Sequence, residues 1–260
     1  MTAANLKLGE YTGLGESYSR FRPGYSESVL AALCGLLRRP VSGLDAVDVG
    51  AGTGIWSRML AKTGFRSVTA VEPNDDMRSH GIRDSEGTGI VWRAGTGEST
   101  GLADNCCDLV SMASSFHWVD FEKGTAEFRR MLRPGGQFIA LWNPRYIEAN
   151  PILVEIEDKL NRMKPDMKRV SSGRSGRTEN LTEMLQASPH FEDVVYIEGR
   201  HVSLLTVDQY IGAWQSVNDI QVQLGTAGFA AFLDFIRDRL KGMDTVEATY
   251  LTRAWVARAA

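Results

Sequence analysis

The spacing of apolar positions along the chain predicts strands and helices in alternation. Short apolar runs bounded by glycine or polar residues predict strands at 46–49, 67–71, 90–93, 107–112 and 137–142. Apolar residues three and four apart, together with helix start and stop signals, predict helices at 26–38, 55–62, 75–81 and 121–131. This order indicates an α/β fold with a Rossmann-like, doubly wound and mainly parallel sheet.

The second half of the chain follows a different pattern. A helix predicted over 151–163 precedes the polar, locally basic segment 164–177, which is either a solvated loop or a lid over an anionic substrate. Strands are then predicted at 194–197, 200–205 and 245–258, with helices at 207–215 and 229–240. We expect this region to complete a seven-stranded sheet with an antiparallel C-terminal strand and to add a small helical cap.

The same pattern divides the chain into four parts. We expect residues 1–25 to form an N-terminal arm and lid, of which the polar, glycine-rich stretch 1–16 is mobile. Residues 26–145 are the expected Rossmann-like core that binds a cofactor. Residues 146–190 are an expected helical and loop insertion that caps the substrate, and residues 191–260 are expected to complete the sheet.

Composition narrows the classes of protein that fit. The 260 residues carry a net charge of −3, without the basic surplus of nucleic-acid-binding proteins, so no nucleic acid is expected as a partner. The cysteines (Cys34, Cys106 and Cys107) lack zinc-site spacing, so no metal is expected, and reduced thiols fit a cytoplasmic location. No signal-peptide pattern is present, and no apolar run approaches the roughly 18 residues that span a membrane, so no membrane partner is expected.

A glycine-rich turn follows the first predicted strand. Gly50, Gly52 and Gly54 lie where a strand passes into a helix, and a backbone without side chains can approach a ligand closely there. The spacing Gly-x-Gly-x-Gly differs from the Gly-x-Gly-x-x-Gly of dinucleotide-binding proteins, and no Walker-type lysine follows. Glu72 comes 22 residues after Gly50, at the end of the next strand, where a carboxylate can accept both hydroxyls of a ribose.

Several motifs resemble one large family. These are Asp48-Val-Gly-Ala-Gly-Thr-Gly54, Val71-Glu-Pro73, Gly95-Thr-Gly-Glu98, Asp108-Leu-Val110, Phe116-His-Trp118 and Leu132-Arg-Pro-Gly-Gly136. Residues 46–142 resemble the core of the class I S-adenosylmethionine-dependent methyltransferases of the type 11 group. The segment 18–25 resembles the N-terminal segment that closes over the cofactor in this group, and the C-terminal region resembles the group only loosely.

The resemblance implies that the chain binds S-adenosyl-L-methionine and assigns residues to it. Gly50, Gly52 and Gly54 would line the methionine part of the cofactor, and Glu72, followed by Pro73, would hold the ribose. Thr96 and Gly97 would flank the adenine, although many relatives carry an acidic residue where Thr96 stands. Ser114 would lie beside the methionyl chain. Tyr18, Arg22 and Tyr25 are candidates for the lid, and Arg22 could pair with the carboxylate of the cofactor.

Candidate residues for the chemistry lie near the expected mouth of the sheet. Methyl transfer is an in-line displacement in which positioning matters most, and a base helps when the acceptor loses a proton. His117, just past the fourth strand, is the candidate catalytic base; alternatively its imidazole only orders the loop or lines the pocket. Aromatic residues there predict a substrate pocket for a flat or apolar acceptor: Phe21, Tyr25, Phe116, Trp118, Trp142, Tyr146 and Trp214.

Three functions remain open from the sequence. The first is methylation of a small metabolite that is flat or apolar, aromatic molecules included, with oxygen, nitrogen or carbon as the acceptor atom. The second is methylation of a macromolecule, either a tRNA or a protein side chain. The third is binding of the cofactor without catalysis, since one fold supports many functions.

Overall fold

The computed structural model describes residues 7–169, 173 and 176–260. A seven-stranded sheet has the order β3-β2-β1-β4-β5-β7-β6, in which β7 runs antiparallel to both of its neighbours. The strands are β1 (Asp45–Val49), β2 (Ser67–Val71), β3 (Val91–Arg93), β4 (Cys107–Ala113), β5 (Leu132–Trp142), β6 (Phe191–Thr206) and β7 (Thr245–Ala259). The predicted fold class is therefore confirmed, including its antiparallel C-terminal strand.

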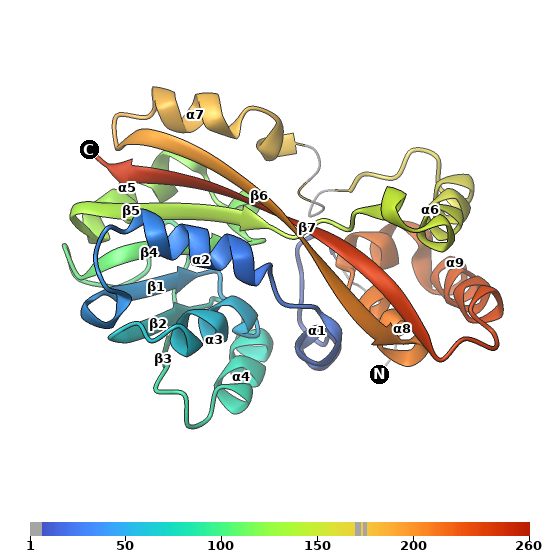
Figure 1. Cartoon of the computed structure of the whole chain (residues 1–260). Coiled ribbons are helices and arrows are strands. Elements are labelled where there is room, and N and C mark those ends of the chain that lie inside the picture. Colours follow the sequence, from blue (N-terminus) through green and yellow to red (C-terminus); the bar gives the residue numbers. More distant parts are fainter. Residues whose placement is uncertain (1–6, 170–172, 174–175) are drawn as a thin grey trace.

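Helices cover both faces of this sheet and continue beyond one end of it (Figure 1). The α-helices are α1 (Gly15–Phe21), α2 (Glu27–Leu36), α3 (Ile55–Lys62), α4 (Asp75–Asp84), α5 (Phe121–Met131), α6 (Pro151–Met163), α7 (Leu181–Ala187), α8 (Val207–Gln215) and α9 (Asn218–Arg239). Short 3₁₀ turns are η1 (Val41–Gly43), η2 (Phe116–Trp118), η3 (Ile147–Ala149) and η4 (Gly176–Glu179).

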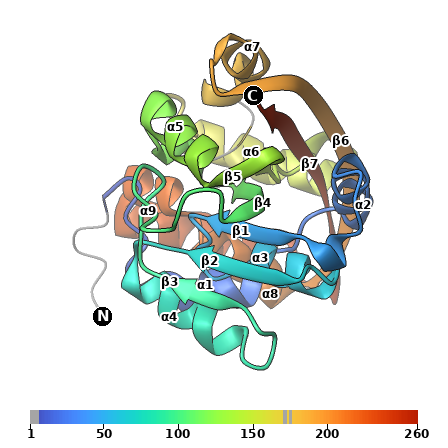
Figure 2. The ribbon, with the colours of Figure 1, turned by 90° about the vertical axis from the view of Figure 1, so that its left-hand side faces the viewer.

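Helices lie on both faces of the sheet (Figure 2), and an apolar layer joins them to it on each face. On one face, Leu30 and Leu33 of α2 pack with Trp56 and Leu60 of α3 against the strands. On the other face, α5 and α7 pack against the sheet through side chains that are fully buried, such as Phe128. Burial on both faces explains why the central strands are continuous apolar runs in the sequence.

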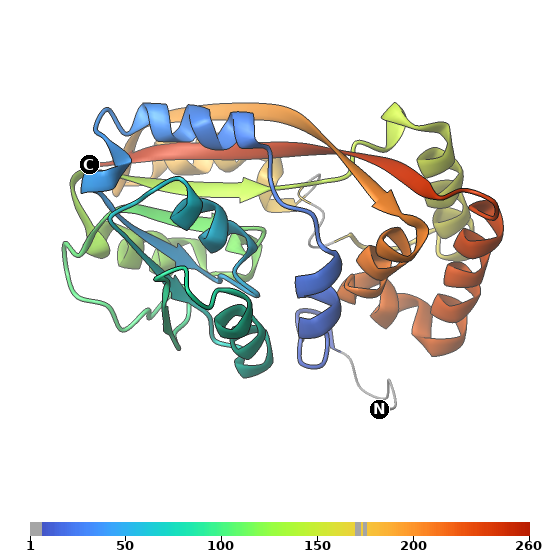
Figure 3. The same ribbon diagram turned by 60° about the horizontal axis from the view of Figure 1, so that its bottom comes forward.

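The long strands β6 and β7 extend past the sheet and carry a helical lobe (Figure 1). The lobe consists of α6, α8 and α9, which share a third apolar core that includes Leu160, Tyr210, Trp214 and Phe232. Helix α1 lies between this lobe and the rest of the molecule (Figure 3), and it contacts α8 on one side and α4 on the other. The expected cap therefore combines α6 with helices that come some fifty residues later in the chain.

Several elements differ from the sequence predictions; helix α7, for example, was not predicted. The two strands predicted at 194–197 and 200–205 are one continuous strand, β6, because Gly199 lets α2 pack closely and does not break the strand. Helix α9 begins at Asn218, well before the predicted start at 229, and it contains a non-helical residue at Gly225. Helix α1 was not predicted; it lies within the N-terminal arm expected over 1–25, and its first two residues fall in the stretch expected to be mobile.

Replacing Gly199 by alanine should destabilise the fold. A Cβ at this position would lie 2.6 Å from Cγ2 of Val29, a stiff and buried side chain of α2. Overpacking of this kind costs about 1–3 kcal/mol, so urea unfolding should show a loss of that size. Gly35→Ala, in α2 with open space around the new methyl group, is the matched control and should be neutral or stabilising. Equal stability of Gly199→Ala and the wild type would contradict the packing described.

Candidate active site

The turn after β1 can be built only with glycine. Gly50 and Gly52 have φ angles of 65° and 58°, in the left-handed region that side chains disfavour. A Cβ on Gly50 would lie 2.7 Å from Cβ of Ser115. Gly54, with a φ of 77°, leads directly into α3, and a Cβ there would lie 2.8 Å from the Trp92 ring. The turn therefore leaves the half-buried backbone of Gly50 and Gly52 free of side chains at the carboxyl edge of the sheet.

The side chain of Glu72 is fixed against this turn at the end of β2. One carboxylate oxygen accepts a hydrogen bond from the Gly52 amide at 2.8 Å, and the other accepts one from the Asn74 amide at 2.9 Å. Burial raises the pKa of Glu72, while these two hydrogen bonds oppose the shift. Because each oxygen has a further lone pair, the carboxylate can still accept two hydroxyl groups.

Asp48 of β1 supports the glycine turn through hydrogen bonds to neighbouring elements. Its fully buried carboxylate accepts hydrogen bonds from Ser57 Oγ of α3 at 2.6 Å and from Ser111 Oγ of β4 at 3.1 Å. Burial raises the pKa of Asp48 to about 7, and the two hydroxyl groups act in the opposite direction. One side chain therefore joins β1, β4 and α3 directly beneath the glycine turn.

A cavity of about 350 Å³ opens at this edge of the sheet. Nine of the ten residues predicted to bind a cofactor line it: Tyr18, Arg22, Gly50, Gly52, Glu72, Pro73, Thr96, Gly97 and Ser114. Gly54 is not part of the lining, because it precedes α3 and faces Trp92 and Arg58. Within the described residues, the buried Nε1 of Trp56, another lining residue, has no hydrogen-bond partner. The cavity thus combines a glycine cradle, a buried carboxylate and an unused donor.

The N-terminal arm forms one wall of this cavity from residue 7 onward. Asp76 of α4 accepts hydrogen bonds from the amides of Gly13 and Gly15, at 2.9 and 3.1 Å. Arg22 donates from Nε to Ser216 Oγ at 2.7 Å, which ties the end of α1 to the end of α8. We expected residues 1–16 to be mobile; these contacts correct that expectation for 7–16, whereas 1–6 lie outside the described residues.

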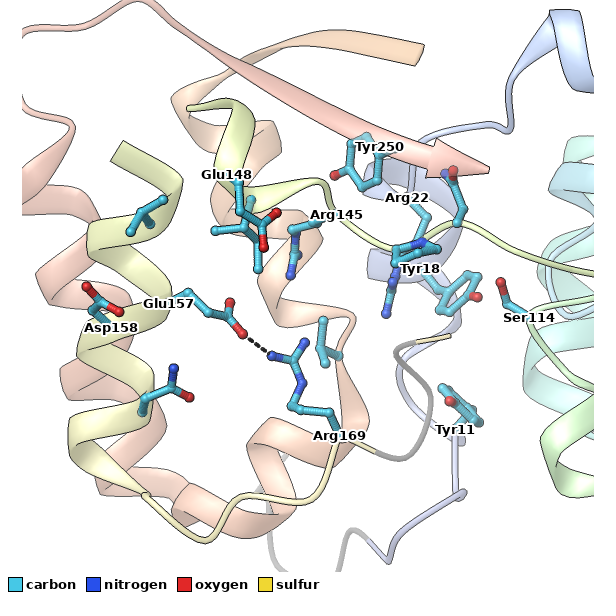
Figure 4. Close-up of a pocket in the computed structure, with 16 residues that line it drawn as sticks. Tyr11, Tyr18, Arg22, Ser114, Arg145, Glu148, Glu157, Asp158, Arg169 and Tyr250 are labelled. Carbon is cyan, nitrogen blue, oxygen red and sulfur yellow. Dashed lines mark hydrogen bonds and ion pairs between the residues drawn. The ribbon is translucent and has the colours of Figure 1, made fainter. Parts of the chain in front are cut away.

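A second cavity, of about 500 Å³, adjoins the first and lies against the helical lobe (Figure 4). Six residues line both cavities: Tyr11, Tyr18, Arg22, Ser114, Asn143 and Tyr250. Ser114 has a positive φ of 57°, and its Oγ lies 2.9 Å from the hydroxyl oxygen of Tyr25. A ligand in the first cavity could therefore meet a second ligand at this shared boundary.

The second cavity is lined by opposite charges (Figure 4). Arg145, just after β5, lies with its guanidinium 3.8 Å from the centre of the Trp214 ring, which orients it. Arg169 forms an ion pair with Glu157 of α6 at 2.5 Å. Glu148 and Asp158 add carboxylates on the same side as α6. The arrangement suits a polar ligand better than an apolar one.

The seven aromatic residues predicted to bind a substrate lie elsewhere. Tyr25 and Trp118 line the first cavity only. Phe116, Trp142 and Trp214 are fully buried core residues, since large rings stabilise the fold most when they are packed. Phe21 packs against Gly212, and Tyr146 accepts a hydrogen bond from Arg200. None of the seven lines the second cavity, so the expected aromatic pocket is not found there.

His117 also lies outside the lining of both cavities. It lies in η2 next to Trp142, whose Nε1 donates a hydrogen bond to His117 Nδ1 at 3.3 Å. Burial lowers its pKa to about 4, with a smaller contribution from the charge of Arg177. His117 lines neither cavity, so its geometry favours the structural role over that of a base.

Some lining residues were not identified from the sequence. Arg145 follows the carboxyl end of β5, where ligands bind in sheets of this kind, so its position is a signal that was available. Glu157, Arg169 and Tyr250 reach the cavity from α6, the segment after it and β7. No local pattern marks these three residues, because only the tertiary fold brings them together.

The fold is Rossmann-like, and the first cavity lies at the carboxyl edge of its sheet. Residues 47–140 match the family described as a methyltransferase domain. The segment 47–140 is therefore a methyltransferase domain of this family.

Known relatives share this domain or the whole fold. An uncharacterised methyltransferase of Mycobacterium tuberculosis is 33% identical over 54% of each chain. A ubiquinone biosynthesis O-methyltransferase of Rhizobium etli is 29% identical over 49% of this chain and 52% of its own. The chain thus matches about half the length of these curated relatives. A solved structure of a candidate type II methyltransferase from Anaeromyxobacter dehalogenans is 23% identical, with a TM-score of 0.66 over 92% of this chain and 98% of its own.

In the part of the chain that is described, no helix is both long enough and apolar enough to cross a membrane. Among the same residues, histidine, cysteine and acidic side chains form no group of three or more that could hold a metal ion.

The buried imidazole of His117 should make stability depend on pH. Its pKa of about 4 in the folded chain lies below the ordinary value of 6.5, so the unfolded chain binds the proton more tightly. This contribution is present above pH 6.5 and is lost as the pH falls towards 4, by roughly 3 kcal/mol in total. We predict that, as the pH falls from 6.5 to 4, the wild type loses about this much unfolding free energy relative to His117→Phe. A difference that is constant over this range would show that the imidazole titrates normally.

Proposed function

We propose that the chain transfers a methyl group from S-adenosyl-L-methionine to a small polar acceptor. The first cavity would hold the cofactor and the adjoining second cavity the acceptor. The observation that carries this proposal is the shared boundary between the two cavities, next to the Glu72 carboxylate and the glycine turn. Bound cofactor would supply an activated methyl group on a sulfonium, so the protein mainly has to position the acceptor.

Different lining residues would bind different parts of the cofactor. Glu72 would accept the ribose hydroxyls, and the bare backbone of Gly50 and Gly52 would let the methionyl part approach. Thr96 and Gly97 would lie beside the adenine. Arg22 donates hydrogen bonds to the hydroxyl and carbonyl oxygens of Ser216, which are both neutral. Its positive charge would therefore be available to an anionic group such as a carboxylate.

The acceptor would be polar, in contrast to the flat or apolar molecule expected from the sequence. Arginine and carboxylate side chains line the second cavity, and none of the seven aromatic residues predicted to bind the substrate does. Desolvating charged groups against an apolar molecule would cost free energy without any compensating hydrogen bond. Proton transfer from the acceptor would then fall to a lining carboxylate or a tyrosine hydroxyl group, because His117 does not reach this cavity.

Replacing Glu72 by alanine should weaken cofactor binding at least about a hundredfold. The variant removes two charge-assisted hydrogen bonds, each worth about 1.5–3 kcal/mol. Calorimetric titration with S-adenosylmethionine and S-adenosylhomocysteine measures the change. Glu86→Ala, at an exposed loop position, is the control and should bind as the wild type does. An unaltered affinity of Glu72→Ala would remove the ribose assignment, and no binding to the wild type at millimolar cofactor would remove the proposal.

Methyl-label transfer should distinguish a small acceptor from a macromolecule. We predict that label from methyl-labelled S-adenosylmethionine enters the small-molecule fraction of a cell extract. RNA and protein from the same extract should stay unlabelled, because a cavity of about 500 Å³ admits a metabolite and not a folded polymer. Label recovered in RNA or protein would favour the macromolecular alternative, and label in no fraction would favour a binding protein.

A further inference from the structure

β6 is a long edge strand with an exposed apolar surface. It spans 16 residues and pairs with β7 alone among the described strands (Figure 1). Four of the nine large hydrophobic side chains exposed in the described part of the chain lie on it: Val195, Tyr196, Val202 and Leu204, at 38, 42, 58 and 68%. Edge strands of this length are normally protected against pairing, since their free backbone groups template another strand.

The side chains on one face of β6 form a palindrome around Gly199. Alternate residues of a strand share a face. One face of β6 therefore carries Val194, Tyr196 and Glu198 before Gly199, and Arg200, Val202 and Leu204 after it. Read outward from Gly199, each half has one charged residue and then two hydrophobic residues. The charges on the two halves are opposite.

We propose that β6 pairs antiparallel with β6 of a second copy of this chain, with the two-fold axis at Gly199. In this register Glu198 faces Arg200 of the partner subunit. On the other side of the axis, Arg200 faces Glu198 of the partner subunit. Tyr196 and Val194 then face the hydrophobic residues of the partner strand. Opposite charges and apolar pairs directly across an antiparallel ladder both stabilise it.

Contacts within the chain already orient the two charged residues on this face. The Glu198 carboxylate lies 3.6 Å from Nε of Arg253, and the Arg200 guanidinium stacks 4.4 Å above the Tyr146 ring. Both side chains remain exposed. Because arginine has five N–H donors, Arg200 can keep its bond to Tyr146 and still bind a carboxylate.

The palindrome favours a second copy over an unrelated partner. Any β-strand could use the free backbone of β6, but an unrelated strand would not need charges arranged symmetrically about one glycine. Gly199 would face its own counterpart at the axis, where the absence of a Cβ lets both copies of α2 keep their close contact with β6.

A charge-swap experiment tests this register. Light scattering and sedimentation equilibrium should show that the wild type dimerises at micromolar concentration. Glu198→Lys alone and Arg200→Glu alone should each raise the dissociation constant at least about tenfold, because two ion pairs become two repulsions. An equal mixture of the two variants should recover a heterodimer, since every position 198 then faces an opposite charge at position 200.

Controls separate this interface from general surface effects. Leu204→Lys should weaken the dimer, whereas Ile82→Lys, at a hydrophobic residue of α4 that is 51% exposed, should not. A wild type that stays monomeric at high micromolar concentration would overturn the proposal. So would single variants that dimerise as the wild type does, or a mixture that stays monomeric. Cofactor binding by each variant, measured in parallel, reports folding independently of the oligomeric state.

Discussion

The hydrogen bond from the Gly52 amide to the Glu72 carboxylate fixes the first cavity, and the geometry of the rest of the site depends on it. It joins the turn after β1 to the end of β2 at 2.8 Å, and it requires a backbone that only glycine adopts readily. Asp48 supports the turn from β1 through Ser57 and Ser111. Burying a carboxylate costs free energy unless the carboxylate is hydrogen-bonded. Glu72 and Asp48 each accept two such hydrogen bonds, which offset this cost.

The second cavity depends on the unusual length of β6 and β7. These strands run past the sheet and hold the helical lobe opposite the carboxyl edge, while α1 lies between the two parts. The second cavity is therefore lined by residues that are far apart in the sequence, from Tyr11 near the start to Tyr250 near the end. The lobe lies outside the segment 47–140 that matches the methyltransferase domain, so the proposed acceptor site combines that domain with the later part of the chain.

Local signals explain which features could be predicted from the sequence. The glycine turn, Glu72 and the alternation of strands and helices are each encoded within a few residues, and the mainly parallel seven-stranded sheet was predicted, although β6 was divided into two strands. Aromatic residues such as Trp142 and Trp214 carry no local sign of whether they face a ligand or the core, and here they are buried. Gly199 suggested a break in a strand, although it serves close packing against Val29. Residues such as Glu157 and Arg169 reach the site only through the tertiary fold.

A crystal structure with S-adenosylhomocysteine tests the central claim most directly, namely that the two cavities hold cofactor and acceptor side by side. We predict that both ribose hydroxyls lie within hydrogen-bond distance of the Glu72 carboxylate. The sulfur should then face the shared boundary formed by Tyr18, Ser114 and Tyr250, towards Arg145 in the second cavity. A sulfur that faces away from this boundary, or an adenosyl group bound outside the first cavity, would contradict the assignment.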